Sequence, residues 1–197
     1  MGIELPHFYI GSSYGGQQAW CSDFWMHEGG CAAITACDCS IYFELYKNRR
    51  GLCPFDVKNF DRDDYLKFAV DVMQPYLRPR WTGIDRLEIY IEGFQKFLRD
   101  RGESSIELLP FDGDRSVESA RIVIQNQIDD GWLIPCLTLN HKNPRFRDYV
   151  WHWFLINGLD GDRVRLVSYG IGRWVELGDL WSTGFERKGG LIIFQAH

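Results

Sequence analysis

The spacing of apolar residues divides the chain into an early part with a helical period and a late part with a strand period. In residues 63–77 (DDYLKFAVDVMQPYL) and 83–102 (GIDRLEIYIEGFQKFLRDRG), apolar positions recur every three or four residues, which predicts two amphipathic helices. Thr82 is placed to open the second of them, and its final glycine to end it. A further helix, buried on most sides, is predicted over residues 31–46, where small residues give way to large apolar ones.

After residue 103 the apolar positions mostly alternate, as they do in strands with one buried face. One exception is residues 114–131, which keep a helical period and begin near Ser116, a good N-cap residue, and end at Gly131. The predicted strands cover residues 104–111, 132–140, 149–158, 162–170, 173–181 and 189–197. Asp160 and Gly161 form a hairpin signal between two of them.

Helices followed by antiparallel strands predict an α+β fold and not a doubly wound one. Residues 1–102 form the mainly helical part, and residues 103–197 the mainly antiparallel sheet. The first thirty residues, rich in glycine, serine and aromatic side chains, are expected to form an ordered loop. Without a repeat or a clear linker, residues 1–197 are interpreted as a single domain.

Charge and cysteine content narrow the function classes. The net charge of -5 and the absence of any Lys/Arg block argue against a nucleic-acid surface. No stretch has the length and apolar character of a membrane span or a signal peptide. Six cysteines without an export signal indicate reduced thiols, so we expect a cytoplasmic protein. The sequence leaves the oligomeric state open.

The run GGCAAIT presents one cysteine, Cys31, at the start of a predicted helix. A helix N-terminus favours the thiolate, and the backbone N–H of Cys31 is positioned to donate to an oxyanion. The two preceding glycines leave room for a substrate carbonyl. A thiol nucleophile needs a base, and the best candidate is His152, which begins an apolar strand between two tryptophans. His141, in a loop beside Lys142, is the rival base.

These motifs together resemble the papain-like cysteine peptidases, and among them the branch that includes the bacteriocin-leader-processing (double-glycine) peptidases. The resemblance rests on GGCAAIT at a helix start, then VIQNQIDDGWLIPCLTLN, then HWFLINGLDGDRVRLVSYG. It spans residues 17–170. It implies a papain-like fold in which the nucleophile helix packs on the antiparallel sheet, with the site in a cleft between them.

The resemblance also implies roles for individual residues. Cys31 matches the nucleophile and His152 the general base. The family uses a glutamine upstream of the cysteine as an oxyanion donor; Gln17 and Gln18 are both available, and Gln18 is chosen, although the intervening loop must fold back for either to serve. The orienting acid of the family falls at Ser168, which carries no charge to stabilise an imidazolium.

Two residues near the histidine are possible substitutes for the missing acid if the strand geometry allows. They are Asn157, at an offset that points to the opposite face of the strand, and Asp160. The departure at this position leaves the catalytic competence of the chain open.

The predicted function is therefore peptidase-like or amidase-like acyl transfer through a Cys31 thioester, acting on a peptide or a small amide-containing substrate without cofactor or metal. The alternative is a degenerate papain-like domain that binds a peptide or ligand. Three weaker alternatives are a purely structural role for the Cys31 thiol, Cys21 as nucleophile, and a zinc site built from Cys37 and Cys39 with Cys21, Cys31 and Cys53.

Overall fold

A computed structural model describes residues 2–81 and 83–197 of the chain. In it, an antiparallel sheet packs against a layer of helices. The main sheet has seven strands in the order β4-β9-β5-β6-β7-β8, with β1 paired to the far end of β6. Its strands are β1 (Ile3–Glu4), β4 (Ile106–Asp112), β5 (Ile134–Thr138), β6 (His152–Asp160), β7 (Arg163–Ser168), β8 (Ile171–Glu176) and β9 (Gly190–Ala196). A small second sheet pairs β2 (Tyr9–Ile10) with β3 (Ser13–Tyr14).

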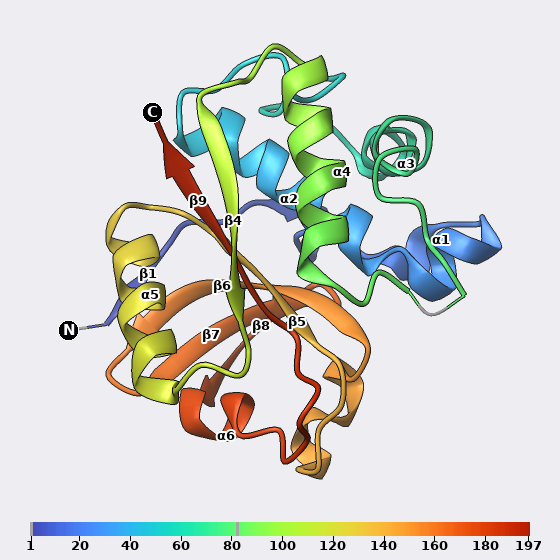
Figure 1. Ribbon diagram of the computed structural model, residues 1–197. Helices are drawn as coiled ribbons and strands as arrows, with labels where there is room; N and C mark the ends of the chain where they lie inside the picture. Colours follow the sequence, from blue (N-terminus) through green and yellow to red (C-terminus); the bar gives the residue numbers. More distant parts are fainter. Residues whose placement is uncertain (1, 82) are drawn as a thin grey trace.

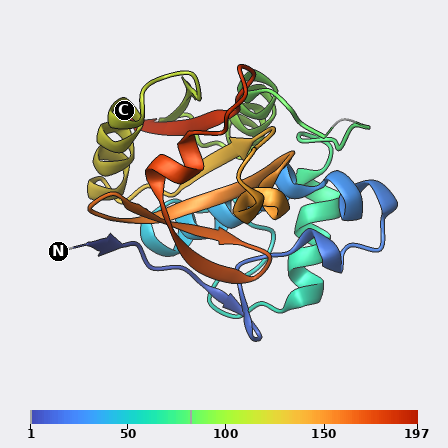
Figure 2. The ribbon, with the colours of Figure 1, turned by 90° about the horizontal axis from the view of Figure 1, so that it is seen from below.

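Helices α1–α4 gather at one end of the molecule, and strands β6–β8 lie at the other (Figure 1). The helical elements are η1 (Gln18–Trp20), α1 (Phe24–Gly29), α2 (Cys31–Tyr46), α3 (Arg62–Lys67), η2 (Phe68–Met73), α4 (Leu87–Asp100), α5 (Val117–Asp129), η3 (Pro144–Tyr149) and α6 (Leu177–Trp181). Seen from below, the N-terminal segment runs from the side of α5 towards α1 (Figure 2).

The core joins α2 and α4 to strand β6. Helix α2 is buried on all sides from Cys31 to Phe43 and packs against β6. On β6, the Trp153 ring stacks on Tyr90 of α4 with 4.4 Å between ring centroids, and its indole N–H donates to the carbonyl of Ile84 at 2.6 Å. Because that indole is both packed and hydrogen-bonded, it fixes the first residues of β6 relative to the helices.

The predicted α+β class is confirmed, and helix α2 has the predicted bounds. The helix over 114–131 is also confirmed, because Ser116 accepts a hydrogen bond from the backbone N–H of Ser119 at 3.1 Å. The predicted start at Thr82 lies outside the described residues. Helix α4 begins only at Leu87, because Ile84 and Asp85 make tertiary contacts instead, to Trp153 and Arg187 respectively.

Three other predictions were wrong in detail. The strand expected over 173–181 ends at Glu176 and continues as α6, whose buried Leu177, Leu180 and Trp181 have helical spacing. The helix over 63–77 is α3 followed by a π-helical stretch, η2. The loop expected over the first thirty residues contains helix α1, capped by the Asp23 side chain, which accepts from Met26 N–H at 2.9 Å.

Candidate active site

Cys31 is the first residue of α2, which follows α1 after the single residue Gly30. The backbone N–H of Gly30 donates to the carbonyl of Met26 at 3.0 Å, and a Cβ atom at Gly30 would lie 2.3 Å from that oxygen. The second glycine of GGC is therefore required by the tight last turn of α1, which it caps. A Cβ atom at Gly29 would make only ordinary contacts to Pro79 and Arg80. Gly29 also lines an open groove beside Cys31.

The Cys31 thiol is buried, and burial dominates its electrostatics. Desolvation raises the pKa of Cys31 to about 11. Backbone N–H groups of Trp153, Ala32 and Cys31 itself oppose this shift by hydrogen bonding to the sulfur. The contact with Trp153 places the sulfur against the beginning of β6, next to His152. At neutral pH the thiol is protonated despite its place at a helix N-terminus.

His152 opens β6, and its imidazole is held from two sides. Its Nε2 atom lies 2.7 Å from the hydroxyl oxygen of Ser168, near the end of β7. The ring of Tyr169 stacks on the imidazole with 4.7 Å between centroids and 5° between planes. Burial lowers the pKa of His152 to about 4, so the imidazole is neutral at pH 7. The sequence analysis placed Ser168 near the histidine but missed Tyr169.

Cys31 and His152 line one cavity of about 30 Å³, together with Ser168, Gln17 and Gln18. The other imidazole nitrogen, Nδ1, makes no hydrogen bond within the part of the chain that the structure describes. Residues far apart in the sequence, from the N-terminal loop, α2, β6 and β7, thus contribute polar side chains to one small space. Their chemistry is that of a thiol beside a neutral imidazole whose Nε2 is bonded to a hydroxyl.

Two aromatic residues beside this cavity have a left-handed backbone. Trp151, just before His152, has φ 54°, and Tyr169, just after Ser168, has φ 52°. Bulky side chains rarely adopt this region, which costs about 1–3 kcal/mol per residue. The fold therefore holds both rings at the site although their residues locally prefer a negative φ. No periodicity in the sequence signals such a position.

The two candidate oxyanion glutamines differ in their bonds. The Gln18 amide nitrogen donates to the carbonyl of His27 at 2.9 Å and to that of Glu28 at 3.5 Å. The loop between Gln18 and Cys31 therefore folds back as the sequence required. The Gln17 amide donates to the hydroxyl of Ser13 at 2.8 Å. Both glutamines reach the cavity, but the hydrogens of Gln18 are directed at α1.

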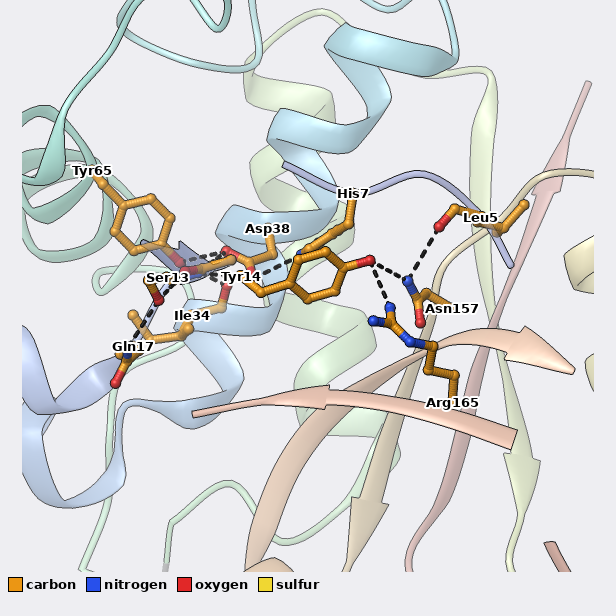
Figure 3. A network of polar contacts seen from close by, with 12 residues as sticks. Leu5, His7, Ser13, Tyr14, Gln17, Ile34, Asp38, Tyr65, Asn157 and Arg165 are labelled. Atoms are coloured by element: carbon orange, nitrogen blue, oxygen red, sulfur yellow. Dashed lines mark hydrogen bonds and ion pairs between the residues drawn. The ribbon is translucent and has the colours of Figure 1, made fainter. Parts of the chain in front are cut away.

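Asp38, a buried carboxylate on α2, ties the N-terminal loop to this helix (Figure 3). It accepts from the Gly16 backbone N–H at 3.2 Å and from the Tyr65 hydroxyl at 2.7 Å, and His7 Nε2 lies 3.6 Å away. Because Gly16 directly precedes Gln17, this carboxylate sets where the glutamine-bearing loop meets the cavity. An aspartate in the middle of the predicted buried helix is the sequence signal that could have found this group.

The rival residues lie in other surroundings. Cys21 does not line the cavity, and burial, followed by the charge of Asp23, raises its pKa to about 11. His141 Nε2 donates to the carbonyls of Asp179 and Leu180 on α6. Asn157 donates to the carbonyl of Leu5 and the hydroxyl of Tyr14.

Neither Asn157 nor Asp160, the two possible substitutes for the orienting acid, is bonded to His152. Asp160 lies exposed at the far end of β6. All six cysteines are free thiols. Among the described residues, no group of three or more His, Cys, Asp or Glu side chains is arranged to hold a metal ion. In the same residues, no helix combines the length and apolar character needed to cross a bilayer.

A larger groove of about 490 Å³ also reaches Cys31. Its walls are the exposed rings of Phe24 and Trp25 on α1, Trp81 in the loop before α4, and Trp151 before β6. Trp25 and Trp81 meet edge to face, with 6.0 Å between centroids. Cys31 is shared by this groove and the small cavity, whereas His152 lines only the cavity.

Comparison with known proteins gives no further guide, since no protein-family model, curated protein or solved structure matches the chain.

Proposed function

We propose that this chain is a papain-like cysteine hydrolase that transfers acyl groups through a thioester on Cys31, with His152 as general base. The observation that carries the proposal is the shared cavity, in which His152 Nε2 bonds Ser168 while Nδ1 has no partner among the described residues. A base that receives the thiol proton on Nδ1 must carry its own proton on Nε2 and donate it to the Ser168 oxygen.

The first step is attack of the Cys31 sulfur on a carbonyl carbon as His152 takes the thiol proton. Both groups are neutral beforehand, because burial raises the pKa of Cys31 to about 11 and lowers that of His152 to about 4. The proton therefore moves during the reaction and not before it. The Cys31 backbone N–H, together with an amide of the glutamine-bearing loop, is the proposed oxyanion donor set.

A peptide-like nitrile tests the proposal, because a thiol adds across the C≡N bond without a leaving group. We expect N-acetyl-phenylalanine nitrile to form a thioimidate on Cys31, located by mass spectrometry in the wild type and in Cys21→Ala. Cys31→Ala should form none, and His152→Gln should form it at least about tenfold more slowly. An adduct that persists in Cys31→Ala and disappears in Cys21→Ala would transfer the nucleophile to Cys21.

The second candidate function is a papain-like domain that binds a peptide or ligand without catalysis. It is favoured by the two pKa directions, which leave the pair uncharged, and by the uncharged Ser168 beside the histidine. Saturable binding of the nitrile with no covalent adduct on any cysteine would decide for this function.

A further inference from the structure

Resting on the proposed function, we propose that the substrate is a primary amide with an aromatic acyl group, and that water is the acceptor. The products are then ammonia and a carboxylate. This assigns the bond that is cleaved and excludes both internal peptide bonds and transfer to a large amine.

The sizes of the two spaces around Cys31 carry the argument. The cavity that also contains His152 has a volume of about 30 Å³, and roughly 10–15 Å³ of such space is enough for one water molecule. The groove that also reaches Cys31 has about 490 Å³. A substrate side chain fits only the groove, and a molecule the size of water or ammonia fits the cavity.

Proton transfer decides which part of the substrate enters which space. The leaving nitrogen must collect its proton from His152, so it has to lie on the side of the sulfur where His152 is found. The acceptor must lose a proton to the same imidazole, so it occupies the same place in the second half of the reaction. Because about 30 Å³ takes only groups the size of one or two water molecules, the leaving group is ammonia and the acceptor is water.

The acyl group is assigned to the groove by its walls. Trp81 is 86% exposed, and Phe24, Trp25 and Trp151 are also exposed large apolar side chains. Trp151 presents its ring from a backbone with φ 54°, a region that bulky residues rarely adopt. Aromatic rings stack on such walls, and the shared Cys31 makes the groove continuous with the site.

The steps balance without any co-reactant except water. The Cys31 sulfur forms a C–S bond with the amide carbon, the C–N bond breaks, and the thiol proton passes through His152 to the nitrogen, releasing ammonia. Water then adds to the thioester carbon, the C–S bond breaks, and the proton taken by His152 returns to the sulfur. A carboxylic acid leaves and ionises.

A pair of substrates with one acyl group tests the leaving group. We expect the wild type to release ammonia from N-acetyl-phenylalaninamide, and to cleave N-acetyl-phenylalanine N-butylamide at least about 100-fold more slowly. Trp81→Ala should weaken use of the aromatic amide about tenfold relative to acetamide. Trp174→Ala, an aromatic deletion in a separate pocket lined by arginines, is the matched control and should leave that ratio unchanged.

Acceptor size is tested with hydroxylamine and butylamine added to the primary amide. Hydroxylamine should yield the hydroxamate, and butylamine should yield no butylamide. Ile34 lines the cavity one helical turn after Cys31, so Ile34→Ala enlarges it and should allow butylamide to form. Ile124→Ala deletes the same atoms from a fully buried site on α5 and should not.

The outcomes separate this inference from the proposed function. Cleavage of the butylamide at a rate equal to or above that of the primary amide, or transfer to butylamine by the wild type, overturns the inference while the nitrile adduct on Cys31 keeps the proposed function. Failure to turn over either amide by a protein that still forms the adduct also overturns it. Absence of both turnover and adduct refutes the two together.

Discussion

His152 Nε2 lies 2.7 Å from the Ser168 hydroxyl oxygen, where a charged acid would complete a catalytic triad. The hydroxyl orients the imidazole but supplies no negative charge to an imidazolium. This pair therefore supports a base that can receive a proton but is weakly stabilised once it has done so.

Replacing Ser168 with aspartate should strengthen the base. Ser168→Asp is expected to raise the pKa of His152 and to accelerate formation of the nitrile adduct on Cys31 by about tenfold or more. Ser168→Ala, which removes the hydrogen bond without adding charge, should slow the same reaction. Adduct formation measured over time for the three proteins checks the order, and an equal rate in all three would remove Ser168 from the site.

The pH dependence of alkylation should report a buried neutral thiol. Because burial raises the pKa of Cys31 to about 11, its reaction with iodoacetamide should keep rising with pH beyond about 10, where an ordinary thiol with a pKa of about 8.5 levels off. Site-resolved mass spectrometry allows Cys21, with a pKa also raised to about 11, to act as an internal reference. A plateau for Cys31 below pH 8.5 would instead indicate a preformed thiolate–imidazolium pair.

Acid should destabilise the protein partly through His152. Burial lowers the pKa of His152 from 6.5 to about 4, so the unfolded chain binds a proton in this window and the folded chain does not. The contribution of the neutral imidazole to the free energy of unfolding is fully present above pH 6.5. It declines by roughly 3 kcal/mol as the pH falls towards 4. Urea unfolding between pH 7 and pH 4 should therefore show a smaller loss of stability in His152→Gln.

The matched control for that comparison is His27→Gln, which removes a histidine whose side chain is 48% exposed. This variant should follow the wild type across the pH range. An identical acid dependence for His152→Gln and the wild type would contradict the buried neutral imidazole.

The junction before Cys31 should tolerate no side chain. In Gly30→Ala the new Cβ would lie 2.3 Å from the Met26 carbonyl oxygen, so the last turn of α1 must distort, at a cost of about 1–3 kcal/mol. Gly178→Ala in α6 is the control, because nothing lies within 4 Å of the added atom, and alanine is the better helix former. Thermal unfolding should show a lower midpoint only for Gly30→Ala, and equal midpoints would refute the crowding.

Much of the layout follows from local patterns. The small-to-large gradient over residues 31–46 gave helix α2 with its bounds, and the N-cap at Ser116 gave the start of α5, because such signals depend on neighbours a few residues away. The same kind of local pattern gave a wrong prediction at α6, because three apolar residues with helical spacing also fitted the continuation of a strand. It also failed at α1, a short helix hidden in an aromatic-rich segment.

The sequence alone determined that a cysteine begins the buried helix and that a histidine begins an apolar strand, because both statements need only residue order and period. Tertiary structure decided that they line one cavity, that Tyr169 covers the imidazole, and that Asp38 anchors the glutamine-bearing loop. It also decided the protonation states of Cys31 and His152. The sequence favoured a thiolate at a helix N-terminus, but burial, which depends on segments more than a hundred residues apart, outweighs the helix and keeps both groups neutral.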